Sequence, residues 1–224
     1  MHLEAHAALG WVIGNAGQNS RRVRNWCVAA AVIPDIDAIP YVFGPEAYGR
    51  WHHTFGHNLF LLIALSGVAA WHCRARPAAR GSSARAFWFT AAGFASHLVT
   101  DAFFSGWYLY LLWPVSSYGY LPEHHVGLEH PINVWLIYVG LVAVIGMGAL
   151  RKRTPVDIFW PKLDAIIVGL FRSRPLSCSV CGRPGNQRCH QCGRPTCARH
   201  ARLTRHADIV CPDCLPGRVI ANSQ

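Results

Sequence analysis

Four pairs of potential metal ligands lie close together near the C-terminus and restrict what that part of the chain can fold into. Each pair encloses two residues, and the pairs run from Cys178 to Cys214. This spacing is typical of tetrahedral zinc sites, and the pairs suffice for two such sites. Because no ligand position would stay open, we expect both zinc ions to be structural. The predicted ligands are Cys178, Cys181, Cys189, Cys192, Cys197, His200, Cys211 and Cys214.

The short gaps between the pairs favour a cross-brace. In that arrangement the first and third pairs bind one ion, and the second and fourth pairs bind the other. Sequential pairing into two ribbons is the alternative. Gly182 and Gly193 directly follow CxxC pairs and suit knuckle-type turns. The region, taken as 178–216, resembles small cross-brace zinc fingers such as B-box or FYVE-like modules, a resemblance that names a fold and not a partner. We separately expect the tail to serve docking or regulation through an unknown protein partner.

The positive charge of the chain lies mainly in this tail. The net charge is +10, of which residues 1–150 carry +1 and residues 151–224 carry +9. Deprotonation of the thiol ligands and binding of two Zn²⁺ would lower the charge of the tail to about +6. Charge alone therefore does not support a nucleic-acid partner. The paired cysteines also favour a reducing compartment over a disulfide framework.

The rest of the chain has the composition of a membrane protein. Hydrophobic residues make up 52% of the sequence and charged residues only 14%, against about 25% charged residues in soluble domains. A membrane span needs about 20 apolar residues, so only 133–150 is a comfortable span. The other apolar stretches are expected to be short spans, half-embedded helices or buried core helices. The stretches are 5–20, 25–34, 57–73, 86–112 and 133–150.

Clusters of basic residues predict how these stretches are oriented. The positive-inside rule places the clusters in the cytoplasm, so that successive stretches alternate in direction. We therefore expect an all-α, membrane-embedded antiparallel helical bundle over 1–150, in a bacterial-type inner or plasma membrane with the tail cytoplasmic. Residues 151–177 form a linker whose piece 157–171 is amphipathic and could lie on the membrane surface. The clusters are Arg21, Arg22 and Arg24; Arg74, Arg76, Arg80 and Arg85; and Arg151, Lys152 and Arg153. No cleavable signal peptide is expected, because an acidic residue rather than a basic segment precedes the first stretch.

Several ionisable residues interrupt the apolar stretches, and at membrane depth such residues are costly and usually functional. Taken singly, each could be a buried core residue or a turn residue. In the predicted topology, however, all of them fall at the same end of the bundle, which predicts a metal site. His53 could replace His52 as a ligand, because His53 and His57 are four residues apart. The predicted ligands are His6, Asp35, Asp37, His52, His57, His97 and Asp101.

Imidazole and carboxylate ligands without cysteine suit zinc, iron or manganese, and a set of this size suits a hydrolytic centre with more than one metal. Two other functions stay open. A non-catalytic membrane scaffold or adaptor would use the set only to bind structural metal. A metal-ion transporter would need polar residues in both halves of the bundle. The loop 122–131 could add a ligand or a general acid, or be an exposed polar loop; its candidates are Glu123, His124, His125, Glu129 and His130.

The order of these motifs resembles the LexA-regulated, membrane-bound metal-dependent hydrolase family over about residues 1–150. The family pattern of His, Asp-x-Asp, His-x4-His, His-x3-Asp and Leu-Trp-Pro-x-Ser is matched at His6, 35–37, 52–57, 97–101 and 112–116. Members often read HRGxTHS where this chain has HHTFGHN, so His53 replaces an arginine and anion recognition through it is in doubt.

The resemblance implies a hydrolase that uses one or more divalent metals, expected to be zinc, with Asp37, His97 and Asp101 in catalysis. Distant similarity of the family to zinc-dependent phospholipase C and P1 nuclease implies a phosphoester substrate, with membrane phospholipid as one candidate.

Overall fold

The computed structural model describes residues 1–17, 19–74, 82–170, 176–185, 187–204 and 208–215. The chain divides into two compact units, Met1–Arg151 and Lys152–Gln224. The division falls beside the expected end of the membrane domain at residue 150. Three parts of the predictions fall outside the described residues. They are Arg76 and Arg80 of the second basic cluster, residue 171 at the end of the amphipathic piece, and residue 216 at the expected end of the tail.

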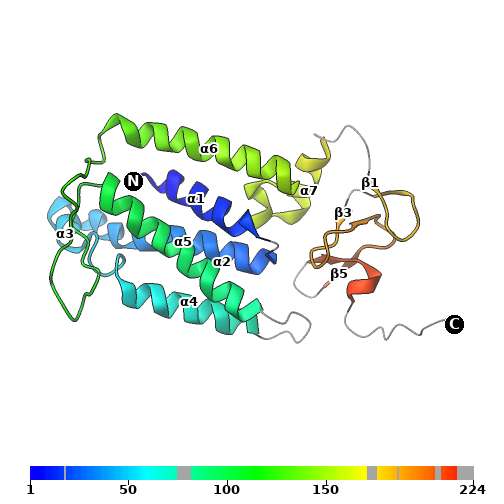
Figure 1. Ribbon diagram of the computed structural model, residues 1–224, viewed down its shortest axis with the longest axis horizontal. Coiled ribbons are helices and arrows are strands. Elements are labelled where there is room, and N and C mark those ends of the chain that lie inside the picture. The colour runs from blue at the N-terminus through cyan, green and yellow to red at the C-terminus, as the bar shows by residue number, and fades with distance from the viewer. Residues whose placement is uncertain (18, 75–81, 171–175, 186, 205–207, 216–224) are drawn as a thin grey trace. The chain divides into compact units, whose positions relative to one another are not determined.

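The first unit is an antiparallel helical bundle (Figure 1). In it α2 lies against α1 and α5, α4 lies against α5, and α6 lies against α1. The N-terminus, α3 and the connections before α4 and α6 gather at one end of the bundle. The helices are α1 (Leu3–Ala16), α2 (Arg21–Val32), the 3₁₀ helix η1 (Ile33–Phe43), α3 (Pro45–Trp51), α4 (Leu59–Arg74), α5 (Ser82–Phe104) and α6 (Pro131–Arg151).

Glycines let the central helices approach closely. A Cβ atom at Gly10 of α1 would lie 2.5 Å from the Ala31 Cβ of α2, and one at Gly93 of α5 would lie 2.3 Å from the Cys27 carbonyl oxygen. Small residues at such crossings are typical of helix packing in membranes. Larger side chains, led by Phe94, fill the remaining space between α2, α4 and α5.

The helix that begins at Arg21 is longer than the sequence indicates. The apolar stretch 25–34 stops at a proline, but η1 carries the helical path on to Phe43. Pro34 lies in the first turn of η1, where a missing N–H removes no necessary hydrogen bond. By length and composition, Arg21–Phe43 and Pro131–Arg151 are therefore the candidate membrane spans among the described residues.

The apolar stretch 86–112 is helical only in part, because α5 ends at Phe104. Gly106 adopts a positive φ of 75°, and the Trp107 backbone N–H donates to Ser105 Oγ. The following loop is fixed by a bridge between Leu109 and Tyr120. The apolar residues after Phe104 therefore belong to the loop end of the bundle.

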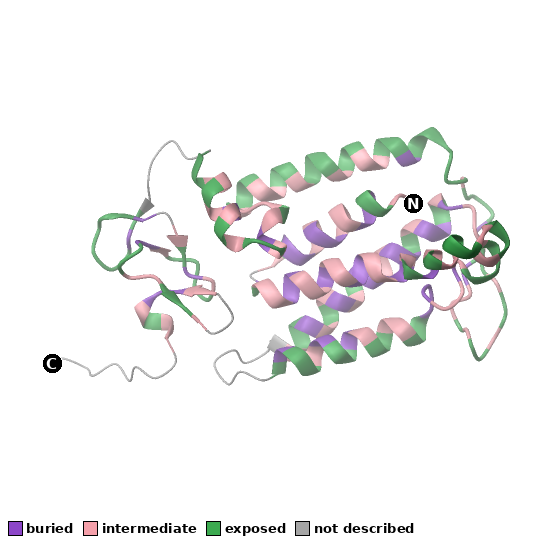
Figure 2. Ribbon diagram, turned by 180° about the vertical axis from the view of Figure 1, so that it is seen from behind, coloured by how far each residue is buried: buried purple, intermediate pink, exposed green. Residues whose placement is uncertain are grey.

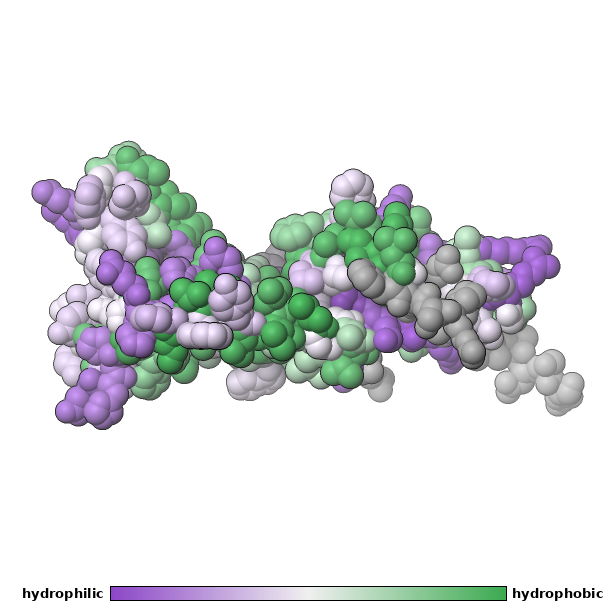
Figure 3. Space-filling view, turned by 90° about the horizontal axis from the view of Figure 1, so that it is seen from above, coloured by the Kyte–Doolittle hydropathy of each residue, from purple (hydrophilic) through white to green (hydrophobic). Residues whose placement is uncertain are grey.

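Helix α6 is exposed along most of its length (Figure 2). Only 6% of its most apolar window is buried. Hydrophobic residues cover much of the face shown in Figure 3, while hydrophilic residues gather at the loop end of the bundle. An apolar helix exposed in this way suits contact with lipid. Its exposed large side chains include Val134, Trp135, Tyr138, Val139, Leu141, Val142, Ile145 and Leu150.

The second unit combines short helices with small antiparallel hairpins. The chain is mostly helical, as the expected all-α bundle followed by a small zinc-binding domain implies, and in this second unit knuckle turns with positive φ at Gly182 and Gly193 reverse the chain into hairpins. Helix α7 lies within the predicted amphipathic piece. The elements are η2 (Pro155–Ile158), α7 (Pro161–Leu170), β1 (Leu176–Ser177), β2 (Pro184–Gly185), β3 (Gln187–Arg188), β4 (Pro195–Thr196), β5 (Arg202–Leu203), β6 (Ile209–Val210) and η3 (Pro212–Cys214).

Candidate metal centres

All the predicted bundle ligands lie at the loop end of the helical unit. His6 is in the first turns of α1, and Asp35 and Asp37 are in η1, at the far end of α2. The segment 52–58 connects α3 to α4 at the same end. His97 and Asp101 are in the last turns of α5. Antiparallel packing thus brings residues that are up to 95 positions apart in the sequence to one place.

The Asp101 carboxylate is at the centre of the group, and its side chain is only 2% exposed. Its Oδ1 lies 3.0 Å from His6 Nε2 and also contacts the Met1 amino group. Its Oδ2 lies 3.2 Å from the Nε2 atoms of His53 and His97 and 3.3 Å from that of His57. Four imidazole nitrogens therefore surround one buried carboxylate.

The hydrogen bonds on the far side of the rings fix the tautomer of His57 and His97. His97 Nδ1 lies 2.7 Å from the Ala31 carbonyl oxygen, and His57 Nδ1 lies 2.8 Å from Asp37 Oδ2. Both oxygens only accept hydrogen bonds, so in a neutral ring each Nδ1 carries the proton and each Nε2 presents a lone pair. These two Nε2 atoms are 2.9 Å apart.

His6 repeats this arrangement. Its Nδ1 lies 3.4 Å from Thr100 Oγ1, whose hydroxyl donates to the Ser96 carbonyl 2.8 Å away. A neutral His6 that donates from Nδ1 to this hydroxyl would also present a lone pair at Nε2. Lone pairs that converge on a carboxylate repel one another unless a cation lies between them, and divalent metal ions supply that charge.

The side chains form two candidate ligand groups that share Asp101: His6, Asp35, His97 and Asp101, and His53, His57 and Asp101. Ligand atoms within each group all lie within 4.8 Å of one another, and tetrahedral ligands at zinc are about 3.4 Å apart. The rings of each group stack, with centroids 3.7 Å apart for His6 and His97 and 4.1 Å apart for His53 and His57.

Two predicted ligands, Asp37 and His52, lie outside both groups. Asp37 Oδ2 accepts from His57 Nδ1 and from the Gly56 backbone N–H, 3.1 Å away. Asp37 Oδ1 is 3.0 Å from His52 Nδ1. The structure thus places Asp37 as the partner that orients a ligand, a common arrangement behind metal-bound histidine.

His53 faces Asp101 where the sequence favoured His52. Its backbone has a positive φ of 61°, which is uncommon outside glycine and persists where the surroundings demand it. This conformation turns His52 and His53 to different sides, one toward Asp37 and the other toward Asp101. The spacing of four between His53 and His57 was the sequence signal for this arrangement.

Gly56 allows the close approach of the segment 52–58 to η1. A Cβ atom there would lie 2.1 Å from the Pro34 carbonyl oxygen and 2.8 Å from Asp37 Oδ2. Asn58 then caps α4 by accepting from the Leu61 backbone N–H at 2.8 Å. The segment is therefore fixed at both ends, and His57 is held between them.

Among the described residues of the two candidate groups, Asp35 is the one with a partly exposed side chain, and His52 beside the groups is also partly exposed. The side chain of Asp35 is 21% exposed and that of His52 is 10% exposed. The other ligand side chains of both groups are at most 2% exposed. Tyr48 stacks on His52, with ring centroids 4.4 Å apart. The loop candidates Glu123, His124, His125, Glu129 and His130 are exposed and join neither group.

The tail contains two further groups, arranged as the predicted cross-brace. One is Cys178, Cys181, Cys197 and His200, and the other is Cys189, Cys192, Cys211 and Cys214. The Cys181 and Cys197 sulfurs are 3.8 Å apart, and those of Cys192 and Cys211 are 3.7 Å apart. Sulfurs about 2.3 Å from a tetrahedral ion are about 3.8 Å apart, so each group could hold a metal ion.

Local backbone groups favour the thiolate at one cysteine of each tail group, whereas the pKa values of Cys181, Cys211 and Cys214 are raised, with burial and the neighbouring cysteines of the same group among the causes. Burial opposes ionisation of the Cys178 thiol, but N–H groups of Val180 and Cys197 outweigh it and lower its pKa to about 6. Burial also opposes ionisation of Cys189, where the N–H groups of Cys211 and Cys192 lower the pKa to about 7. The thiolate is the form that binds metal.

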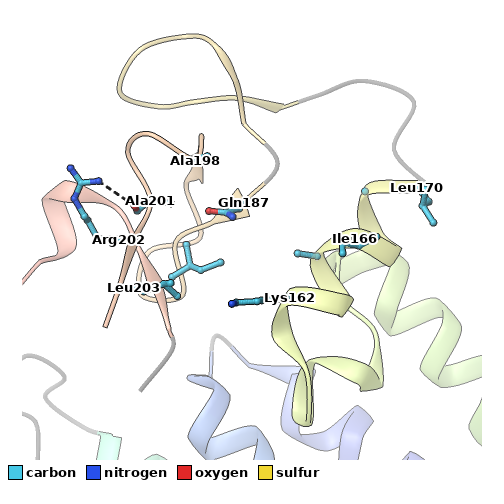
Figure 4. Close-up of a pocket in the computed structure, with 11 residues that line it drawn as sticks. Lys162, Ile166, Leu170, Gln187, Ala198, Ala201, Arg202 and Leu203 are labelled. Carbon is cyan, nitrogen blue, oxygen red and sulfur yellow. Dashed lines mark hydrogen bonds between the residues drawn. The ribbon is translucent and has the colours of Figure 1, made fainter. Parts of the chain in front are cut away.

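A hollow of about 820 Å³ lies in the second unit between α7 and the cysteine-containing hairpins (Figure 4). Lys162, Ile166 and Leu170 line one side, and Arg202 and Leu203 line the other. The residues that join these two sides, 171–175, lie outside the described chain. We assign no function to this hollow.

A family model described as YdjM inner membrane protein matches residues 1–173 of this chain. The match covers the bundle and α7 but not the paired cysteines. It is consistent with the expected LexA-regulated membrane protein family, although its description names no activity. No curated protein and no solved structure matches the chain.

Proposed function

The chain belongs to the YdjM inner membrane protein family, and from this premise we propose that it is a membrane-bound, metal-dependent hydrolase of phosphoesters. The observation that carries the proposal is the convergence of the His6, His57 and His97 lone pairs on the buried Asp101 carboxylate. Such a set suits a divalent metal ion, which would add to the positive charge that the Met1 amino group supplies at Asp101 Oδ1. Asp101 offers one oxygen to each side and could bridge two ions.

The residues fit a divalent metal pair better than a structural site. The second group has only three candidate protein ligands, one of them shared with the first, so a tetrahedral ion there would have one coordination position for water or substrate. Metals held there would activate a water and neutralise charge on the phosphoryl oxygens. We propose zinc for these ions and for the two structural ions of the tail.

The remaining polar groups have supporting roles in this proposal. Asp37 accepts from His57 Nδ1–H and so keeps His57 Nε2 free for metal. Asp35 lies at the solvent-facing edge, where substrate would enter. His52, held at Nδ1 by Asp37 and partly exposed, is placed to give a proton to the leaving alcohol.

The test measures metal content and hydrolysis on the full-length protein in detergent. We expect the protein to bind metal in both units and to hydrolyse bis(p-nitrophenyl) phosphate, and we expect His97→Ala to lose the bundle metal and the activity together. Chelation should abolish the activity, and zinc or manganese should restore it.

The matched control is Cys189→Ser, which removes a ligand from the tail alone. It should lose tail metal and keep the activity. A metal-loaded protein that hydrolyses neither this probe nor phospholipid would leave the scaffold function in place of the hydrolase. We also propose that the tail lies in the cytoplasm and binds another protein. Labelling of tail cysteines from each side of the membrane tests the orientation.

A further inference from the structure

An apolar groove lies at the same end of the bundle as the candidate metal ligands. Its volume is about 550 Å³, within the range of about 300–1,000 Å³ of small-molecule sites. Its walls come from η1, α3, the α3–α4 connection and the loop after α5. The lining residues are Pro40, Phe43, Ala47, Trp51, Phe55 and Trp113.

The geometry of η1 connects this groove to the metal centre. Side chains three residues apart eclipse one another in a 3₁₀ helix, with about 6 Å between turns. Asp37, Pro40 and Phe43 therefore share one face of η1. Asp37, which contacts His57, lies at one end of this face, and Pro40 and Phe43, which line the groove, lie at the other. Trp51 and Phe55 also flank His52 and His53 in the sequence. The groove therefore begins beside the partly exposed edge of the centre.

The chemistry of the groove suits an alkyl chain. None of its lining side chains is ionisable, and only the indole N–H groups of Trp51 and Trp113 are polar. Three residues beside it on η1, Ile36, Ile39 and Val42, are 48%, 57% and 74% exposed. They belong to the candidate span Arg21–Phe43, so the groove is continuous with an apolar surface that lipid would cover.

We propose that this groove binds one acyl chain of a membrane phospholipid whose phosphoester group lies at the bundle metal centre. The inference rests on the proposed hydrolase function and specifies its substrate class. A polar centre beside an apolar groove matches the two chemical halves of a phospholipid. The groove then makes long-chain lipid phosphoesters better substrates than soluble ones, because binding of the remote chain contributes to catalysis.

The first measurement is photolabelling, which requires no hydrolysis. The full-length protein is placed in vesicles of phosphatidylethanolamine and phosphatidylglycerol that contain a phospholipid with a diazirine on its acyl chain. Labelled peptides are mapped by mass spectrometry. We expect label in the segment 40–55 as well as on the lipid-exposed helix α6.

Two tryptophan variants on the same short helix separate binding in the groove from general lipid contact. Ala47→Trp fills the groove, whereas Gly49→Trp adds the same side chain where no atom lies within 4 Å of the new Cβ. We expect Ala47→Trp to remove the label from 40–55 and to lower phospholipid hydrolysis about tenfold. Its hydrolysis of bis(p-nitrophenyl) phosphate should stay within about twofold of the unmodified protein.

Equal labelling of the segment 40–55 in both variants would overturn the inference, as would label confined to α6. If no variant hydrolyses any probe, the proposed hydrolase function fails, but the difference in labelling still decides whether the groove binds an acyl chain. If the soluble probe is hydrolysed while Ala47→Trp leaves phospholipid hydrolysis unchanged, the function stands and the groove assignment fails.

Discussion

The two sets of candidate metal ligands in this chain are built in opposite ways. The tail draws eight ligands from 37 consecutive residues, 178–214, in pairs with fixed spacing. The bundle draws its ligands from α1, η1, the α3–α4 connection and α5, between residues 6 and 101. Each tail group has four ligands that could enclose an ion, whereas the bundle groups share a carboxylate and are open toward Asp35 and His52.

The difference shows how two kinds of candidate metal site arise from different parts of a fold. A CxxC knuckle sets the positions of two sulfurs within one turn, so the tail needs little from the rest of the chain. The candidate bundle ligands are positioned by helix packing and by hydrogen bonds that their rings make to Asp37, Ala31 and Thr100. We therefore expect the tail to tolerate changes in the bundle, and the bundle to depend on single contacts.

The largest expected effect is that of Asp101→Asn. The substitution removes the charge that both bundle groups share, so the bundle should lose its metal completely and hydrolysis should fall to background. Metal analysis of the purified protein checks this, with the tail ions as an internal reference. Retention of bundle metal would show that Asp101 is not a bridging ligand, and loss of tail metal as well would show that the two regions are not independent.

Cys189→Ser should have the next largest effect, confined to the tail. Zinc binding contributes about 10–16 kcal/mol to the folding of zinc fingers, so we expect the group around Cys211 to lose its ion and the hairpins near it to unfold. Limited proteolysis and metal content measure this. Hydrolysis of the soluble probe should not change, and a loss of activity would contradict the separation of the two regions.

Gly56→Ala tests how far the bundle depends on one close approach. The new Cβ would meet the Pro34 carbonyl oxygen, so we expect a loss of stability of about 1–3 kcal/mol and weaker metal binding. Thermal unfolding of the bundle measures the change. The control is Gly49→Ala, whose Cβ meets no atom within 4 Å and which should leave the unfolding temperature nearly unchanged.

Asp37→Asn should have the smallest effect, because it keeps the ligands and changes only a partner. The amide cannot accept as strongly from both His57 and Gly56, so metal affinity should fall by about 10–100-fold. Competition with a chelator measures the affinity. Asp164→Asn is the matched control, because that buried carboxylate accepts hydrogen bonds from Thr154 in the second unit. An equal effect of both substitutions would mean that Asp37 acts only through general stability.

The fold of the bundle was predictable in outline because apolar stretches and basic clusters alternate along the chain. The continuation of the helical path past Pro34 as η1 was not predictable, because a proline stops an α-helix but is tolerated in the first turn of a 3₁₀ helix. The sequence predicted knuckle-type turns in the tail. The short strands on either side of these turns, which form hairpins, came only from the structure. Membership of an inner membrane family agrees with the composition of residues 1–150.

The sequence by itself determined the four ligand pairs of the tail, because the spacing within each pair is set by local backbone geometry, and it favoured the cross-brace over sequential pairing. It also named the residue types of the bundle centre and the end at which they meet. Only the tertiary structure decided that His53 rather than His52 faces Asp101, that Asp37 orients His57, and that both groups share one carboxylate. The physical reason is that these choices depend on one positive φ at His53 and on the contact of Gly56 with Pro34, which side-chain periodicity does not encode.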